Sequence, residues 1–221
     1  MIYASIDIET SGLDPEVNSI LSIGVIVEDT DKKLGFEEIP KLKINVLQRQ
    51  IIGSPRAITM NRDLIAVIGE YLDGPKEMKP IFEETQHAKF LEPIDVVPAL
   101  FDFLFLNGHG YDLYPSITIR RADGNILPAL GSITKPVTIN VAGKNFGTFD
   151  KLFLEKLPRW KQLIKVRQRV IDPSVLFCDW KNDETLPSLK ICKERSGVSG
   201  DVAHDAIEDA WDVIQLLRKF Y

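Results

Sequence analysis

Near its beginning the chain reads Ser5-Ile-Asp-Ile-Glu-Thr-Ser-Gly-Leu-Asp14. Apolar and polar residues alternate through this stretch, and the period of two predicts a β-strand that ends at the turn-forming Ser11-Gly12. Asp7 and Glu9 then share one face of the strand. Two adjacent carboxylates repel each other unless protons or cations relieve the repulsion, and ligands that are all oxygen favour Mg²⁺ or Mn²⁺ as the cation.

A second acidic stretch, Ala203-His-Asp-Ala-Ile-Glu-Asp-Ala210, lies near the end of the sequence. Apolar residues from Ala206 to Leu217 recur at helical spacing and predict a terminal helix that contains Asp209. His204 is expected at the start of this helix, where it could move in to accept a proton. Taken alone, the stretch also fits a solvated acidic helix with one surface histidine.

A third stretch connects a strand to a helix. Pro136 to Val141 reads as a short strand, and Gly143 to Asp150 leads from it into an apolar-periodic helix over Lys151 to Leu157. Asp150 falls in the first turn, where an acid often only compensates the helix dipole. Its place in the chain order, between the strand acids and the terminal acids, favours a shared site.

These stretches resemble the DEDDh family of 3′-to-5′ exonucleases. The segments that carry the resemblance are Asp7-Ile-Glu-Thr-Ser-Gly-Leu13, Asn145-Phe-Gly-Thr-Phe-Asp150 and His204-Asp-Ala-Ile-Glu-Asp209. The resemblance implies a ribonuclease H-like α/β fold of three layers, with a central mixed five-stranded sheet flanked by helices. It is clearest over residues 1–30 and 136–221, and it includes Val170 to Ser174 as a strand before the last helices. The related subgroup that has tyrosine one position after the histidine is disfavoured, because Asp205 stands there.

The resemblance also assigns roles to individual residues. Four acids would bind two divalent ions, Mg²⁺ or Mn²⁺, and His204 would be the general base; the expected catalytic residues are Asp7, Glu9, Asp150, His204 and Asp209. The expected substrate-binding residues are Thr10, Gly12, Leu13, Met60, Asn61, Asn145 and Phe149. Asn145 is five residues before Asp150, whereas many proofreading members of the family have the two four apart.

The implied activity is metal-dependent 3′-to-5′ exonuclease cleavage that releases nucleoside 5′-monophosphates from single-stranded DNA or RNA 3′ ends. Two metal ions can stabilise the attacking and leaving oxygens together, and a neutral imidazole suits proton transfer near pH 7. The choice between DNA and RNA cannot be read from the sequence. A replication or repair protein is a conceivable partner.

Two other functions fit parts of the same pattern. A haloacid-dehalogenase-like phosphatase would use Asp7 as its nucleophile, but it would need a second aspartate where Glu9 stands and would leave His204 without a role. A catalytically silent nucleic-acid-binding module would keep the fold without turnover. The presence of all five expected side chains argues against such a loss.

Composition favours one enzyme domain. The 221 residues, 44% of them hydrophobic, suffice for a single α/β domain over 1–221, with an insertion around 107–135. No apolar run has the length of a membrane span, and a cytoplasmic protein without membrane contact is expected. The two cysteines, Cys178 and Cys192, are expected to be reduced thiols, with a disulfide as the less favoured alternative.

The rest of the chain gives a coarser prediction. Strands are expected over 19–28 and 41–47, helices over 54–71 and 93–106, and a β-hairpin insertion from 116–121 and 126–130, with Arg120 and Arg121 beside its turn. The net charge is −5, and four of these charges belong to the expected metal ligands. The basic segment from Lys156 to Arg169 could follow a nucleic-acid backbone, with Trp160 stacking on a base, or could be a solvated helix face.

Overall fold

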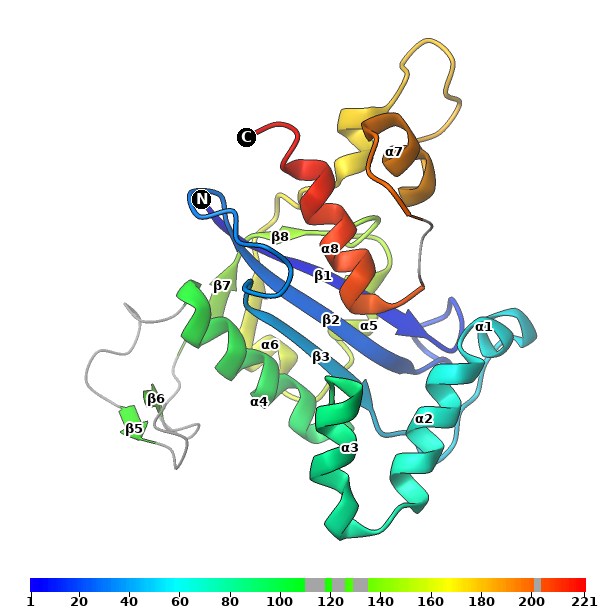
Figure 1. The fold of residues 1–221 in the computed structure, drawn as a ribbon, viewed down its shortest axis with the longest axis vertical. Coiled ribbons are helices and arrows are strands. Elements are labelled where there is room, and N and C mark those ends of the chain that lie inside the picture. Colours follow the sequence, from blue (N-terminus) through cyan, green and yellow to red (C-terminus); the bar gives the residue numbers. More distant parts are fainter. Residues whose placement is uncertain (110–117, 121–125, 129–134, 201–203) are drawn as a thin grey trace.

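A mixed five-stranded sheet forms the centre of the molecule in the computed structural model, which describes residues 1–109, 118–120, 126–128, 135–200 and 204–221 (Figure 1). The strands lie in the order β4-β3-β2-β1-β8, and their bounds are β1 Ile2–Thr10, β2 Ile20–Asp29, β3 Lys41–Val46, β4 Lys89–Leu91 and β8 Val141–Ala142. β1, β2 and β3 form an antiparallel meander, whereas β4 and β8 pair in parallel with β3 and β1. The predicted ribonuclease H-like sheet is therefore confirmed.

The alternation of residues along β1 separates two cores. Ile6 and Ile8 belong to the larger core, which includes Val97 and Phe101 of α4 (Pro93–Leu104). Tyr3 belongs to a second core with Val213 and other apolar residues of α8 (Ala206–Leu217), the helix that crosses the sheet in Figure 1. Because side chains alternate between the faces of a strand, Ser5, Asp7 and Glu9 lie on the α8 side.

Three helices lie at the end of the sheet where β1 terminates: α1 (Pro55–Met60), α2 (Arg62–Asp73) and α3 (Lys79–Gln86), the last preceded by the short turn η1 (Lys76–Met78) (Figure 1). The single helix predicted over 54–71 is thus divided at Asn61, whose backbone is not helical. Tyr71 and Phe90 stack with ring centroids 4.2 Å apart and attach this group to β4.

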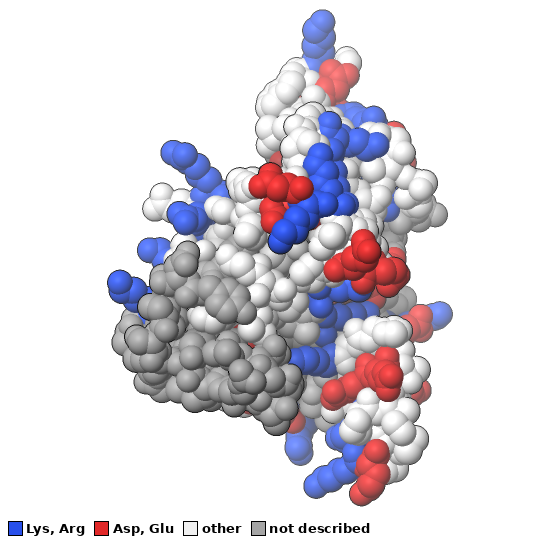
Figure 2. All heavy atoms as spheres, turned by 60° about the vertical axis from the view of Figure 1, so that its left-hand side comes forward, with Lys and Arg blue, Asp and Glu red and all other residues white. Residues whose placement is uncertain are grey.

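The basic segment does not form the helix that its composition suggested. Residues 160–163 form one turn, α6 (Trp160–Leu163), and β9 (Ile164–Val166) then pairs in parallel with β7 (Val137–Ile139). Trp160 is only 3% exposed within the main core, so the stacking role considered for it is wrong. Figure 2 shows that Lys and Arg side chains are interspersed with Asp and Glu on the face drawn there.

Three further predictions can be compared with the structure. The strand expected over 170–174 is reduced to one parallel bridge between Ile171 and Ala142, because Pro173 begins the 3₁₀ helix η5 (Pro173–Phe177). The hairpin is confirmed as the antiparallel pair β5 (Thr118–Arg120) and β6 (Ile126–Pro128). Its turn and Arg121 lie outside the described residues. The helix expected over 93–106 forms α4, which ends at Leu104 and is followed directly by the π-helical turn η2 (Phe105–His109).

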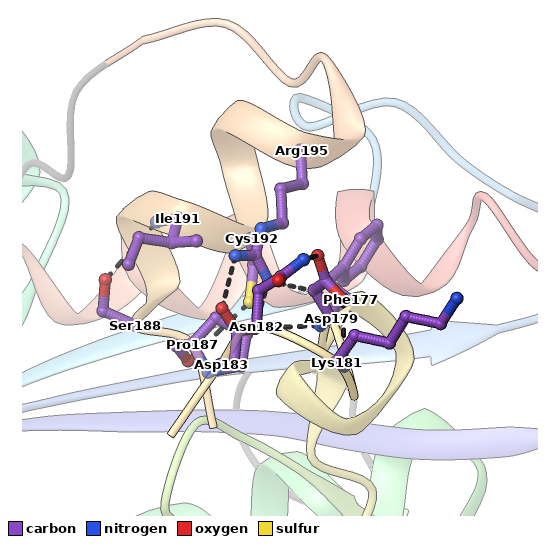
Figure 3. A network of polar contacts seen from close by, with 10 residues as sticks. All are labelled: Phe177, Asp179, Lys181, Asn182, Asp183, Pro187, Ser188, Ile191, Cys192 and Arg195. Atoms are coloured by element: carbon purple, nitrogen blue, oxygen red, sulfur yellow. Dashed lines mark hydrogen bonds and ion pairs between the residues drawn. The ribbon is translucent and has the colours of Figure 1, made fainter. Parts of the chain in front are cut away.

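Polar contacts hold the loop between η5 and α7 (Leu189–Ser196) (Figure 3). Arg195 of α7 donates hydrogen bonds to both carboxylate oxygens of Asp183 and, over 2.7 Å, to the carbonyl oxygen of Phe177. The backbone N–H of Asp179 also donates to Asp183, over 2.9 Å. The loop is therefore attached to the helix that packs beside α8.

The far end of α8 has its own polar network. Arg218 donates two hydrogen bonds to Glu28 of β2, and the Tyr221 hydroxyl contacts both Glu28 and the Tyr3 hydroxyl. Glu28 and Tyr3 are fully buried, so this network fixes the end of α8 against the sheet.

Cys178 and Cys192 are free thiols, as predicted. Among the described residues, every helix is too short or too polar to cross a bilayer.

Candidate active site

Three acids, two from β1 and one from α8, converge at the end of β1. Asp7 and Glu9 lie on the α8 side of the strand, and Asp209 lies in the first turn of α8. One carboxylate oxygen of each lies within 4.8 Å of the others. The structure thus brings together residues that are about 200 positions apart in the sequence.

Gly24 of β2 permits this approach of helix to sheet. It lies directly opposite Asp7 in the antiparallel register, and a Cβ atom at its position would be 2.2 Å from the Ala206 carbonyl oxygen. Only a residue without a side chain therefore allows the start of α8 to rest on the strand at this point. Asp205 caps the helix by accepting a hydrogen bond from the Ile207 N–H over 3.1 Å.

Asp150 is the fourth expected acid. It is the first residue of α5 (Asp150–Leu154) and is only 3% exposed. It is not part of the compact group of three, but it is close enough to Asp7 for its charge to raise the pKa of that carboxyl. The structure therefore places the other three predicted acids near Asp7.

Burial and mutual repulsion shift the titration of these acids in one direction. Burial, followed by the charges of Asp150 and Asp209, holds the pKa of Asp7 well above its usual range. Burial and the charge of Asp209 raise the pKa of Glu9 to about 8, against a hydrogen bond from Asn61 that lowers it. Burial raises the pKa of Asp150 and of Asp209 to about 7. The four acids thus favour protons, or another source of positive charge.

This donor set fits divalent cations. All its ligand atoms are carboxylate oxygens, which Mg²⁺ and Mn²⁺ prefer. One oxygen of Asp209, Oδ1, is buried and has no hydrogen-bond partner among the described residues. Such an orphaned oxygen is costly unless another group coordinates it.

His204 lies beside the acids but outside their group. It is exposed, precedes the first turn of α8 and has a left-handed backbone (φ = 52°). It borders the same cleft as Glu9 and Asp205. His204 therefore lies at the edge of this cleft and is not part of the group formed by Asp7, Glu9 and Asp209.

A second cleft, of about 360 Å³, adjoins Glu9 on the side of α1. Six of the seven expected substrate residues line it: Thr10, Gly12, Leu13, Met60, Asn61 and Phe149. Leu13 is 82% exposed, whereas the amide of Asn61 is buried and donates to the Thr10 carbonyl oxygen over 3.2 Å. Asn61 thereby joins α1 and α2 to the end of β1.

Asn145 is the exception among the expected substrate residues. Its side chain accepts a hydrogen bond from Lys144 over 2.9 Å, and its backbone N–H donates to Asp172 over 3.0 Å. It borders a different, open groove beside the loop shown in Figure 3, together with Asn182 and Asp183. The structure therefore does not bring Asn145 to the cleft that holds Phe149.

Two site residues gained no role from the sequence. Lys43 of β3 forms an ion pair with Asp205, and both side chains are less than one-third exposed. Arg56, at the start of α1, lines the cleft that contains Leu13 and Phe149. The alternation of residues along β3 places Lys43 on the same sheet face as Asp7. The sequence shows that alternation, but only the strand register shows which residues lie next to Lys43.

The fold and the group of acids define a class, the α/β proteins of ribonuclease H-like fold that carry carboxylates at the end of the first strand. No family model matches the chain, and no curated protein matches it in sequence. Among solved structures, the chain is similar to *E. coli* exonuclease I in complex with a dT13 oligonucleotide, with a TM-score of 0.52 and 15% identity.

Two further structures give the same result. The zinc-bound form of the *E. coli* exonuclease I complex with single-stranded DNA has a TM-score of 0.54 and 15% identity, and it is covered over 39% of its length by 98% of this chain. Exonuclease I of Methylocaldum szegediense has a TM-score of 0.53 and 15% identity. This chain spans only about 40% of the first and third of these proteins, and 99% of it is matched in each. The similarity shows a shared fold, and it agrees with the resemblance drawn from the motifs.

Proposed function

We propose that the chain is a single nuclease domain with an insertion around 107–135, and that it removes nucleotides from the 3′ ends of single-stranded nucleic acid. The observation that carries this proposal is the convergence of Asp7, Glu9 and Asp209 within 4.8 Å, with Asp150 beside Asp7, on the fold of exonuclease I. Because the structural neighbours include complexes with single-stranded DNA, DNA is the first substrate to test.

In this proposal the acids Asp7, Glu9, Asp150 and Asp209 hold divalent cations, Mg²⁺ or Mn²⁺, which when bound neutralise charge on the scissile phosphate and activate water. The protein supplies the geometry, because the β1 acids and the α8 acid are fixed on rigid elements.

His204 would take the proton from the attacking water. Its exposed position at the edge of the cleft lets the imidazole reach water and then release the proton to solvent. The second cleft, with Leu13 and Phe149 at its rim, would hold the end of the strand against apolar surface, and Arg56 would contact a phosphate.

The test is a time course on 5′-labelled single-stranded DNA and RNA of one sequence, with Mg²⁺, Mn²⁺ or a chelator. The matched control is Asp7→Asn, which keeps the shape of the side chain and removes its charge. A ladder that shortens from the 3′ end, depends on the cation and disappears in the variant is expected. Intact substrate in every arm would overturn the proposal. A covalent aspartyl intermediate trapped on Asp7 would instead favour a phosphatase.

A further inference from the structure

The paired strands β7 and β9 belong to two segments of the chain that contain no acids. Asp and Glu make up 32 of the 221 residues, yet residues 135–149 and 156–171 contain neither. Every charged residue in both segments is Lys or Arg. The two segments lie side by side, because β7 and β9 pair in parallel. A chain with a net charge of −5 therefore has one region of purely positive charge.

The strand β9 brings part of this charge to the surface. Ile164 and Val166 contact the main core. Because side chains alternate between the faces of a strand, Lys165 and Arg167 point the other way. Both are exposed, and so is Arg169, two residues further along the chain. Lys165, Arg167 and Arg169 are called the basic strip below.

The cations of the basic strip have no counter-charge of their own. Within the part of the chain that the structure describes, none of the three side chains forms an ion pair or a hydrogen bond. Lys156, earlier in the same segment, differs because it pairs with Glu16. Several unneutralised cations close together attract a polyanion, which can satisfy all of them at once.

The strand register gives the distance between the basic strip and the acids. Thr138 of β7 pairs with Lys165. Four residues later the same chain pairs with β1, at Ala142 beside Ser5. Asp7 is two residues further along β1, so Lys165 lies about 20 Å behind it along the strand direction, at about 3.3 Å per residue. A nucleic-acid strand with about 3.4 Å per nucleotide needs about six nucleotides or more to span this distance.

We propose that the basic strip binds the phosphates of single-stranded nucleic acid, in the part of the strand upstream of the 3′ end held at the acids. The inference rests on the proposed function, since it takes the polyanion to be the substrate of that site. Contacts to phosphates add affinity and carry no sequence information. The basic strip therefore favours long strands over short ones and takes no part in the cleavage step.

The experiment measures binding in chelator by fluorescence anisotropy, so that cleavage does not interfere. The probes are 5′-fluorescein-labelled dT3, which is too short to reach the strip, and dT16, each at about 50 to 300 mM salt. The strip variant replaces Lys165, Arg167 and Arg169 together by glutamine. The matched control replaces Lys76, Lys181 and Lys219 by glutamine, which changes the net charge equally at three other exposed sites.

We expect the strip variant to bind dT16 about 10- to 100-fold more weakly than the wild-type protein and to bind dT3 equally well. The slope of log Kd against log salt for dT16 should fall by about 2, because each phosphate contact on a single strand contributes about 0.7. The control should bind both probes as the wild-type protein does. The melting temperature of the strip variant should stay level, since its three side chains are exposed and unpaired.

Unchanged dT16 binding by the strip variant would overturn the inference, and so would equal losses in the variant and the control, which would show an effect of net charge alone. Self-association of the variant with unchanged binding would instead assign these cations to protecting β9, which pairs only with β7 among the described residues.

These outcomes are distinct from failure of the proposed function. Loss of dT16 binding in the strip variant supports the basic strip even if the wild-type protein cleaves no oligonucleotide. Cleavage of dT16 with the same kcat/KM by the wild-type protein, the strip variant and the control would retain the exonuclease and remove the basic strip from it.

Discussion

Lys43 and Asp205 form an ion pair that joins β3 to the start of α8, one residue after His204. The side chains are 19% and 31% exposed, so the pair is partly shielded from water. Asp205 also caps α8, and its charge contributes to the raised pKa values of Glu9 and Asp209. Lys43 therefore both fixes the backbone next to His204 and offsets the charge of an additional acid at the site.

Replacing Lys43 by methionine should leave Asp205 without its counter-charge. The solvent exposure of this ion pair is intermediate between that of a surface pair and that of a buried pair. We therefore expect a loss of about 1–2 kcal/mol in the free energy of unfolding. We also expect a lower kcat with a smaller change in KM, since the change displaces His204, the proposed proton acceptor, and leaves the second cleft beside α1 intact. Denaturant unfolding and steady-state kinetics measure the two effects. Lys43→Arg should restore most of the activity, and equal kcat values in all three proteins would refute the positioning role.

His204→Asn should slow cleavage by about 10²- to 10⁴-fold, the usual contribution of general-base catalysis. Asparagine tolerates the left-handed backbone of this position, so the variant should fold normally, and it cannot accept a proton near neutral pH. Single-turnover kinetics make the comparison. The matched control is His87→Asn, an exposed left-handed histidine at the end of α3, which should cleave at the wild-type rate. Full activity of the His204 variant would exclude the base role.

Divalent cations should stabilise the folded protein, because they bind the converged acids of the folded state and not the unfolded chain. At a concentration 100 times the dissociation constant the gain is about 2.7 kcal/mol, or about 5–10 °C in melting temperature for a chain of this size. Calorimetry with and without Mg²⁺ or Mn²⁺ measures the shift. Asp209→Asn should reduce it strongly, and an unchanged melting temperature in the wild-type protein would count against a cation site.

The stability of the cation-free protein should fall as pH rises. The folded-state pKa is raised to about 8 for Glu9 and to about 7 for Asp150 and Asp209, above the ordinary values of these acids near 4. The folded state therefore binds protons more tightly than the unfolded state, and this stabilisation is complete below about pH 4 and is lost as pH rises through 7 to 8. Melting temperatures from pH 5 to pH 8.5 in chelator test the slope. A flat or rising profile would contradict the pKa shifts.

Gly24→Ala should displace α8 from the sheet. Because the new methyl group would lie 2.2 Å from the Ala206 carbonyl oxygen, we expect a loss of about 1–3 kcal/mol and a fall in activity. The control is Gly69→Ala in α2, where a Cβ atom meets nothing within 4 Å. That change should stabilise the protein by about 0.5–1 kcal/mol, since alanine favours helices. Thermal unfolding of the two variants should therefore move in opposite directions.

The sequence predicts the framework of this site well and its surroundings poorly. The alternation through Asp7 and Glu9 and the helical spacing around Asp209 are local patterns, and each forms the predicted element. The pairing of Glu9 with Ser22 and of Ser22 with Asn45 is different, because it depends on strand register. No local pattern in β2 or β3 reveals that register, so the row formed by Glu9, Ser22 and Asn45 was not foreseen.

The incorrect predictions have local causes. The segment from Lys156 to Arg169 was expected to be either a rim that follows a nucleic-acid backbone or a solvated helix face, but its β-branched Ile164 and Val166 form a strand against β7 in place of a helix. Trp160, placed among charges in the sequence, turns inward to the core. Asn145 is a different case, because its contact with substrate stays a prediction: it has a left-handed backbone (φ = 57°) and borders a different cleft from Phe149.

The two ends of α8 have different partners, and this makes the helix a mechanical link between distant parts of the molecule. Its first turn carries Asp209, and its last turn is tied through Arg218 to buried Glu28. A rigid helix transmits a displacement along its axis, so loosening the Arg218 contact would also shift the acid at the other end. A substitution at the Arg218–Glu28 ion pair is therefore expected to affect the position of Asp209, although neither residue belongs to the group of acids.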